Sequence, residues 1–225
     1  MVGYESDEKS LAAVRDGLSG LLPRGVAVAV WGLDTQETFL LEAESQAISR
    51  AVESRRQEFA RGRACARHAL ESLGVDPIPL GVGPGRQPLW PEGFVGSITH
   101  GADVVAAVVA SADNLSALGI DVETVDVLSE SVRQAVVQPE DQVGEMEETG
   151  KVLFSAKESV FKALYPLSGV WMDFDAVALT PGPAPKTLRA RPTGRSPAPS
   201  SVAELLGGYR IIGERVVTAF WRLRA

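Results

Sequence analysis

The feature that most restricts the fold is a pattern that occurs twice, a helix-period segment associated with short apolar segments of strand character. Apolar residues recur at three- and four-residue steps over 49–73, which predicts one helix. The same period over 151–165 predicts a second helix, which we expect Pro166 to stop. We therefore predict an α+β fold of two similar lobes, 1–113 and 114–225, related by a pseudo-twofold axis within one compact unit. Each lobe would pack a helix on a small, mainly antiparallel sheet.

Around these two helices, apolar runs bounded by turn-forming residues predict strands. A short helical stretch within 1–24 precedes a buried strand at 26–33, for which we expect a hairpin partner at 38–41. The other predicted strands are 94–99, 104–110, 117–123, 176–180 and 187–192, with a final hairpin at 210–224. The segments expected to be irregular are the glycine- and proline-rich 81–93, the acidic 126–149 and the turn-forming 195–201.

Charge and hydropathy exclude several classes of function. The formal net charge of −7 argues against nonspecific binding to nucleic acid, which requires a large basic surface. No apolar run approaches the roughly 20 residues that a membrane span needs, and the first ten residues are polar and acidic. We therefore expect a cytoplasmic protein that binds neither nucleic acid nor membrane. The single cysteine, Cys65, lies in a helical pattern and is expected to be a buried apolar residue.

The triplet Asp121-Val122-Glu123 follows the apolar run that ends at Ile120. Alternate residues of a strand point to the same face, so the two carboxylates would stand side by side and repel each other. A hard cation removes that repulsion, and Mg²⁺ takes oxygen ligands while keeping room for a substrate phosphate. Two solvated acids at an exposed strand end are the alternative, which the triplet alone favours.

A third acid, Glu158, lies in the second predicted helix between Lys157 and Lys162. The spacing of four residues between Glu158 and Lys162 is also that of an ordinary surface ion pair. By itself, therefore, Glu158 indicates no site.

The first predicted helix carries arginines at close intervals. Arg56 and Arg63 are seven residues apart and fall on nearly one face, with Arg67 one turn further on. Guanidinium groups suit phosphate oxygens, whereas a solvated basic face balanced by Glu58 and Glu71 is the alternative.

A strand end at 96–100 adds two hydroxyl groups and an imidazole next to the glycine-rich loop that contains Arg86. Hydroxyl groups, backbone amides and the His100 ring would suit a pyrophosphate, although a lone histidine at a strand end is more often structural. Taken together, three acids for a metal, a basic set for phosphates and a loop for a nucleotide indicate phosphoryl-type transfer.

Four motifs occur in order between Arg55 and Trp171: RRQEFARGRACAR, GRQPLWPEGFVGSITH, GIDVE and FSAKESVFKA. In this order and spacing the chain resembles the Sfp/EntD-type 4′-phosphopantetheinyl transferases, and four ordered motifs are far more specific than one. Phe154, Phe161 and Gly101 differ from residues common in the family, which affects the contacts expected for the pantetheine arm.

The resemblance implies transfer of the 4′-phosphopantetheine arm of coenzyme A to a serine of an acyl- or peptidyl-carrier protein, with release of 3′,5′-ADP. It implies Mg²⁺, with Mn²⁺ as an alternative ion, coenzyme A as co-substrate, and a monomer with its site between the lobes. The metal ligands implied are Asp121, Glu123 and Glu158. The residues implied to bind coenzyme A are Arg55, Arg63, Gly85, Arg86, Gln87, Pro88, Thr99, His100, Asp121, Lys157 and Lys162.

Among the metal ligands and the residues that bind coenzyme A, the resemblance implies four catalytic residues: Glu158, Lys157, Asp121 and His100. Arg55 would help to bind the 3′-phosphate. The charge of the pyrophosphate would be countered by Lys157, His100 and Arg63. Glu158 or a metal-bound water would accept the proton of the serine hydroxyl. Two alternatives stay open: a Mg²⁺-dependent phosphoesterase that uses the same acids with water, and a noncatalytic module that binds coenzyme A.

Overall fold

The computed structural model describes residues 2–35, 38–101, 103–142 and 149–224 and has the predicted α+β class. Its α-helices are α1 Val2–Leu21, α2 Glu42–Ala47, α3 Glu53–Glu71, α4 Glu130–Val136 and α5 Thr149–Ser168. Its strands are β1 Ala27–Gly32, β2 Gly81–Val82, β3 Pro88–Leu89, β4 Phe94–Gly101, β5 Val104–Ser111, β6 Leu115–Thr124, β7 Val177–Pro181, β8 Thr187–Pro192, β9 Leu206–Ile212 and β10 Arg215–Leu223. Two short 3₁₀ helices cover Phe174–Ala176 and Ser200–Glu204.

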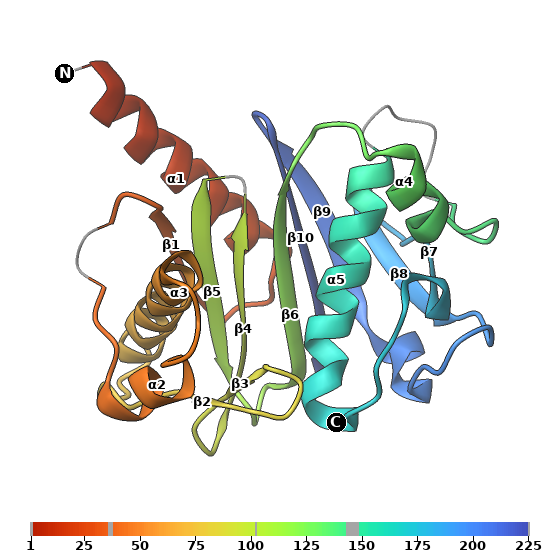
Figure 1. Ribbon diagram of the computed structural model, residues 1–225. Coiled ribbons are helices and arrows are strands. Elements are labelled where there is room, and N and C mark those ends of the chain that lie inside the picture. Colours follow the sequence, from red (N-terminus) through yellow and green to blue (C-terminus); the bar gives the residue numbers. More distant parts are fainter. Residues whose placement is uncertain (1, 36–37, 102, 143–148, 225) are drawn as a thin grey trace.

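The strands form two main antiparallel sheets that stand next to each other (Figure 1). One has three strands in the order β1-β5-β4, and the other has five in the order β6-β10-β9-β8-β7. Helix α3 packs on the smaller sheet, while α5 packs on β6 and β10 of the larger one. Helix α1 contacts β1 as well as β9 and β10, so it joins the two sheets.

The two sheets meet where β4 and β6 lie side by side, a line that we call the seam. Here the Ser97 hydroxyl of β4 accepts a hydrogen bond from the Ile120 backbone N–H of β6 at 3.1 Å. Further along, a Cβ added at Gly101 would lie 2.6 Å from the Val122 carbonyl oxygen, so only glycine allows this approach. The seam thus brings the ends of β4 and β6 together, with the predicted Thr99 and Asp121 on either side.

Helix α5 approaches β6 unusually closely at Gly119. A Cβ at this position would lie 2.0 Å from the Ser159 carbonyl oxygen and 2.6 Å from the Ala163 backbone nitrogen, both in α5. Hydrogen bonds between buried hydroxyl groups also link α5 to the neighbouring strand β10. The Thr218 hydroxyl oxygen lies 2.7 Å from that of Ser159 and 2.9 Å from that of Ser155. Close packing of this kind fixes the height of α5 above the sheet.

The hydrophobic core continues across both halves of the chain. Val14 and Leu18 of α1 are fully buried against Val108 of the smaller sheet and Val217 of the larger one. The boundary predicted near residue 113 stays a prediction. Among the described residues, no helix combines the length and apolarity required to cross a membrane.

The two predicted central helices and the strands at 94–99, 104–110 and 117–123 are confirmed, as are the pair β7–β8 and the final hairpin β9–β10. The similarity of the two lobes stays a prediction, and the two sheets differ in strand number. The segment 81–93 is mostly irregular but contains the small β2–β3 pair, and the predicted irregular segment 126–149 contains α4. Residues 143–148 of the latter lie outside the described residues.

Two predictions are wrong. Residues 38–41 form no strand, because β1 pairs with β5 and the Phe39 carbonyl instead accepts a hydrogen bond from Arg67 at 2.5 Å. Pro166 does not stop α5, which continues to Ser168. The last turn closes around the proline, since the Gly169 N–H donates to the Tyr165 carbonyl at 2.9 Å, and Gly169 ends the helix with a φ of +63°.

We expect Gly119→Ala to lower the free energy of unfolding by about 1–3 kcal/mol, because the added methyl group meets the backbone of α5 and not a flexible side chain. Urea unfolding measures the loss. The matched control is Gly20→Ala in α1, where nothing lies within 4 Å of the added Cβ. Since alanine is the better helix former, this control should gain roughly 0.5–1 kcal/mol. Equal effects at the two glycines would show that the approach of α5 to β6 is not tight.

Candidate functional site

Asp121 of β6 lies at the centre of the seam and is buried, with 4% of its surface exposed. Its Oδ1 accepts hydrogen bonds from the Thr99 hydroxyl at 2.9 Å and from the Lys162 ammonium of α5 at 2.6 Å. Its Oδ2 is buried and has no hydrogen-bond partner among the described residues. A buried carboxylate oxygen without a partner costs free energy, so this atom is available to a ligand that supplies positive charge.

Glu123 and Glu158 complete a group of three acids with Asp121. Burial raises the pKa of Glu123, Asp121 raises it further, and Lys151, whose ammonium is 3.1 Å from the Glu123 carboxylate, opposes this. Burial likewise raises the pKa of Glu158, where Lys162 opposes the shift and Asp121 and Glu123 add to it. The three carboxylates are therefore near enough to repel one another.

This set of acids fits a divalent cation in its chemistry. Oxygen donors that repel one another, one with an unpartnered buried atom, are suited to a hard ion such as Mg²⁺. Within the described ranges, however, no group of three or more histidine, cysteine, aspartate or glutamate side chains is already arranged to hold a metal ion. Ion binding would therefore require these side chains to move.

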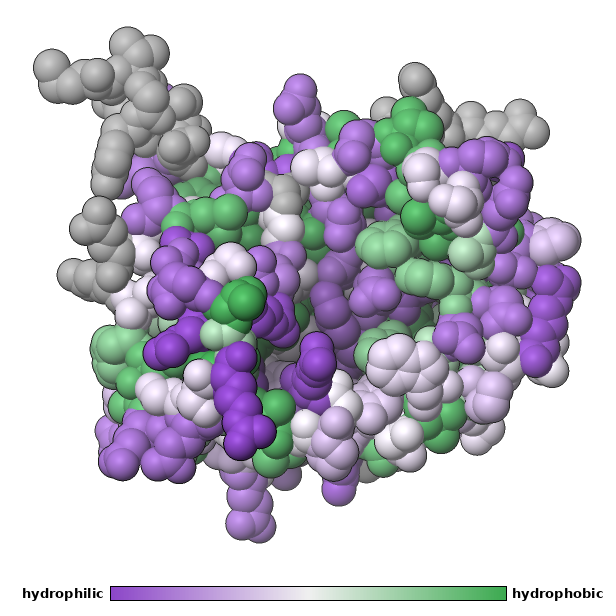
Figure 2. Space-filling model, viewed as in Figure 1, coloured by the Kyte–Doolittle hydropathy of each residue, from purple (hydrophilic) through white to green (hydrophobic). Residues whose placement is uncertain are grey.

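A cleft of about 250 Å³ lies over the seam and is closed on one side by the glycine-rich loop. We call it the seam cleft; its lining is Arg55, Gly85, Arg86, Gln87, Pro88, Gly96, Ser97, Ile98, Thr99, His100, Phe161, Lys162, Tyr165 and Pro166. Figure 2 shows the same face hollowed between the α3 side and the α5 side, with hydrophilic residues gathered in the hollow. Six of the residues predicted to bind coenzyme A from β4 and the loop therefore line one cavity.

The glycine-rich loop joins β2 to β3 and packs against α5. At Gly85 an added Cβ would lie 2.1 Å from the Tyr165 hydroxyl oxygen, so the backbone itself packs against the helix. The Gln87 side chain accepts a hydrogen bond from the Gly85 N–H at 2.9 Å, and Arg86 adopts a φ of +66° in this turn. The loop is thus a folded wall of the cleft.

A second cleft of about 370 Å³ adjoins the first and is basic on its α3 side. The two clefts share Arg55, Arg86 and His100, and the second also contains Arg63 with the apolar Phe59. We call it the arginine cleft. A basic wall next to apolar surface suits a phosphorylated nucleoside.

The arginines of this cleft differ in their freedom. Arg63 is buried and donates to the carbonyl groups of Leu80 and Gly81 at 3.1 and 3.2 Å. Burial lowers the pKa of Arg63 to about 10, so it remains charged at neutral pH. Arg55 is partly exposed and lies 3.1 Å from Glu58 and 3.3 Å from the His100 ring. Arg55 is the more available of the two for a ligand.

His100 connects the two clefts at the end of β4. Desolvation in the cleft lowers the pKa of the His100 ring, an effect that Arg55 and Lys162 strengthen and that Glu58 and Asp121 oppose. The neutral ring is therefore favoured, and it can donate one hydrogen bond and accept another.

A third pocket of about 180 Å³ lies on the other side of α5. We call it the aromatic pocket; its lining is Lys157, Glu158, Val160, Phe161, Trp171, Met172, Asp173, Phe174 and Val177. The Phe161 and Trp171 rings meet edge to face at 5.1 Å, and Trp171 is 62% exposed. Because Phe161 also lines the seam cleft, the polar clefts and this apolar pocket meet beside Glu158.

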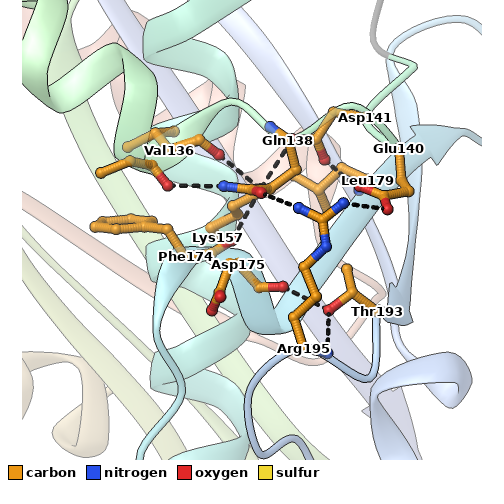
Figure 3. A network of polar contacts seen from close by, with 11 residues as sticks. Val136, Gln138, Glu140, Asp141, Lys157, Phe174, Asp175, Leu179, Thr193 and Arg195 are labelled. Carbon is orange, nitrogen blue, oxygen red and sulfur yellow. Dashed lines mark hydrogen bonds and ion pairs between the residues drawn. The ribbon is translucent and has the colours of Figure 1, made fainter.

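Lys157 is not brought together with the acids of the seam. Its side chain is 3% exposed, and its ammonium group lies 2.9 Å from the Asp141 carboxylate, 2.8 Å from the Val136 carbonyl oxygen and 3.0 Å from that of Phe174 (Figure 3). Its predicted role as a counter-charge to a pyrophosphate stays a prediction.

Comparison with known proteins matches residues 43–110 to the 4′-phosphopantetheinyl transferase N-terminal domain and residues 117–213 to the 4′-phosphopantetheinyl transferase superfamily. The chain is 38% identical over 188 residues to the 4′-phosphopantetheinyl transferase Svp of Streptomyces mobaraensis, a match that covers 80% of this chain and 74% of that protein. The chain belongs to the 4′-phosphopantetheinyl transferase family.

Two further relatives show how far the similarity extends. The chain is 40% identical over 147 residues to the 4′-phosphopantetheinyl transferase PptT of Mycobacterium tuberculosis, covering 62% of this chain and 64% of that protein. It is 36% identical over 121 residues to enterobactin synthase component D of Salmonella typhi, covering half of each. The prediction of an enzyme of this transferase class is confirmed.

Within this transferase, the seam brings together most of the residues predicted from the sequence. The three acids, Lys162, Thr99, His100, Arg55 and the loop 85–88 lie in or beside the seam cleft. Lys151, Tyr165 and Gly119 were missed. Lys151 carried a weak signal, since it lies seven residues before Glu158 on the same helix face. The roles of Gly119 and Tyr165 depend on tertiary contacts, so no local signal could reveal them.

We expect Glu158→Gln to stabilise the metal-free transferase at pH 7. A raised pKa means that folded Glu158 holds its proton more tightly than the unfolded chain, so folding stability falls as pH rises above the usual glutamate value of about 4.3. The variant removes this loss, and its advantage should vanish near pH 4. Thermal unfolding between pH 4 and 8 in a chelator measures the effect, with the exposed Glu92→Gln as the matched control. If both variants behave alike, the folded transferase does not raise the pKa of Glu158.

Proposed function

We propose that this transferase moves the 4′-phosphopantetheine arm of coenzyme A to a serine of an acyl- or peptidyl-carrier protein and releases 3′,5′-ADP. One observation carries the proposal: a basic cleft, an acidic seam and an apolar pocket adjoin in a line that matches the nucleotide, pyrophosphate and arm of coenzyme A. Membership of the family supports the same assignment.

The arginine cleft is the proposed site of the nucleotide. It is lined by the partly exposed Arg55 and the exposed Arg86, so their guanidinium groups are available to phosphate oxygens. We assign Arg55 to the 3′-phosphate, whereas Arg63 would act mainly through its charge because it is buried against Leu80 and Gly81.

The seam cleft is the proposed site of the pyrophosphate. Three groups face this cleft: the Lys162 ammonium, the Thr99 hydroxyl and the neutral His100 ring. The ammonium would offset the negative charge of the phosphate oxygens, and the other two would donate hydrogen bonds to them. The loop 85–88 would cover the nucleotide end of this cleft, with its backbone fixed against Tyr165.

Asp121, Glu123 and Glu158 are the proposed ligands of a Mg²⁺ ion, or of Mn²⁺ in its place. Their repulsion and the unpartnered Asp121 Oδ2 support this assignment. A bound ion would supply charge stabilisation at the phosphate oxygens. The chain itself would contribute the orientation of the acids, which the Lys162 and Thr99 hydrogen bonds provide for Asp121.

The carrier serine must lose a proton as its oxygen attacks the β-phosphorus and the bond to the leaving 3′,5′-ADP breaks. Glu158 is the proposed acceptor, because its carboxylate lines the aromatic pocket next to Phe161, where this pocket meets the seam cleft. Lys162 would offset the charge that develops on the transferred group. The arm would lie along Phe161 and Trp171 in the aromatic pocket.

We expect a purified apo carrier protein to gain the mass of one phosphopantetheine unit when incubated with this transferase, coenzyme A and Mg²⁺. Glu158→Ala should reduce the rate on the order of 10²-fold or more, because it removes the proposed base and a ligand. Intact-protein mass spectrometry measures both, and Glu92→Ala on the exposed loop is the control.

Other outcomes of this experiment would favour other functions. Hydrolysis of coenzyme A without modification of any of several carriers would indicate a phosphoesterase. Binding without hydrolysis or transfer would indicate a noncatalytic module. We propose a cytoplasmic location and a monomeric state as well. The molecular mass of the protein in solution tests the monomeric state.

We expect Arg55→Met to weaken binding of coenzyme A about tenfold. This loss is near the lower end of the range for hydrogen bonds to charged groups, because Arg55 is partly exposed to solvent. Binding of dephospho-coenzyme A, which lacks the 3′-phosphate, should change little. Calorimetric titration of both ligands makes the comparison, and Arg56→Met on the exposed face of α3 is the matched control. An equal loss for both ligands would remove Arg55 from the 3′-phosphate.

A further inference from the structure

The polar network around Lys157 lies behind the aromatic pocket and engages every donor of the ammonium group. The Nζ atom donates to the Asp141 carboxylate, the Val136 carbonyl and the Phe174 carbonyl at 2.8–3.0 Å. An ammonium group has three donors, and these three acceptors use them all. With the side chain 3% exposed, the ammonium has neither a free donor nor access to a phosphate in this arrangement.

Asp141 extends the network to other segments. Its Oδ2 also accepts from the Gln138 backbone N–H at 2.8 Å, and its Oδ1 accepts from the Leu179 N–H of β7 at 2.7 Å. On the outer side, Arg195 donates to the Gln138 and Glu140 side chains at 2.8 and 2.6 Å (Figure 3). The Lys157–Asp141 pair therefore ties α5 to the end of α4, to the turn that follows it and to β7.

This pair also joins the two walls of the aromatic pocket. Lys157 belongs to the α5 wall, and its bond to the Phe174 carbonyl reaches the opposite wall formed by residues 171–177. The Phe154 and Phe174 rings make a second link at 5.3 Å. The separation of the walls thus depends on where Asp141 and the Phe174 carbonyl hold the Lys157 ammonium.

We propose that Lys157 is a positioning residue that fixes the width of the aromatic pocket, and so determines how the pantetheine arm fits, without contacting the pyrophosphate. The inference rests on the proposed function, in which the arm occupies this pocket. It replaces the role that the resemblance implies for Lys157, a counter-charge to the pyrophosphate. The two roles differ in which ligands should bind more weakly when Lys157 is replaced.

The test compares two ligands that share the phosphates and differ in the arm, coenzyme A and adenosine 3′-phosphate 5′-diphosphate. The variant is Lys157→Met with Asp141→Asn, which keeps most of the volume and avoids a lone buried charge. Calorimetric titration with Mg²⁺ should show coenzyme A binding at least fivefold more weakly and the arm-less nucleotide changing less than twofold. Lys186→Met, at an exposed lysine between β7 and β8, is the matched control and should leave both affinities unchanged.

Equal weakening of both ligands would overturn the inference, because it would assign the Lys157 ammonium to the phosphates. Unchanged affinity for both would overturn it as well, since the network would then not shape the pocket. If the unaltered transferase bound neither ligand, the proposed function would fail first, an outcome distinct from either of these.

A second variant covers the case in which the double variant does not fold. Asp141→Asn alone leaves the Lys157 ammonium in place but removes the charge that holds it. A positioning role predicts weaker binding of coenzyme A alone. A phosphate-binding role predicts unchanged or tighter binding of both ligands, because the lysine would be released toward them.

Discussion

The close packing of α5 against β6 at Gly119 is the constraint on which the site depends. It lets the helix backbone touch the strand, so Glu158 and Lys162 lie over the face of β6 that carries Asp121 and Glu123. A methyl group at Gly119 would hold the helix away from that face, and the three acids would separate. The glycine of the GIDVE motif therefore has a packing role, whereas its acids have a chemical one.

The seam between the sheets adds the second half of the site by the same kind of contact. Ser97 and Gly101 allow β4 to lie directly beside β6, which places the Thr99 hydroxyl on Asp121 and His100 at the meeting point of two clefts. Asp121 is consequently held from both sides, by a residue of β4 and by a lysine of α5. Polar groups from two other segments of the chain, β4 and α5, share this one carboxylate, so a change in any of the three side chains alters the hydrogen bonds of the others.

Local patterns in the sequence predicted the central helices α3 and α5 and most of the strands, because periodicity and alternation decide these features. They failed where distant contacts decide. Residues 38–41 resemble a strand locally, but Arg67 holds the Phe39 carbonyl, and α5 passes Pro166 because Tyr165 and Gly169 close the turn. The role at the phosphates that the motif implies for Lys157 stays a prediction. Only the fold reveals that Asp141, sixteen residues earlier, engages its charge.

The position of β10 has a consequence for how the chain reaches its folded state. This last strand lies inside the larger sheet, between β6 and β9, and its Arg215 bonds Ser10 of α1 across 205 positions of sequence. Contacts of such long sequence separation slow folding, since a large loop must close before they stabilise anything. During synthesis neither α1 nor β6 can contact β10 until residues 215–223 have left the ribosome. A chain that loses its last strand therefore loses an internal strand of its larger sheet and part of the core under α1, not a dispensable tail.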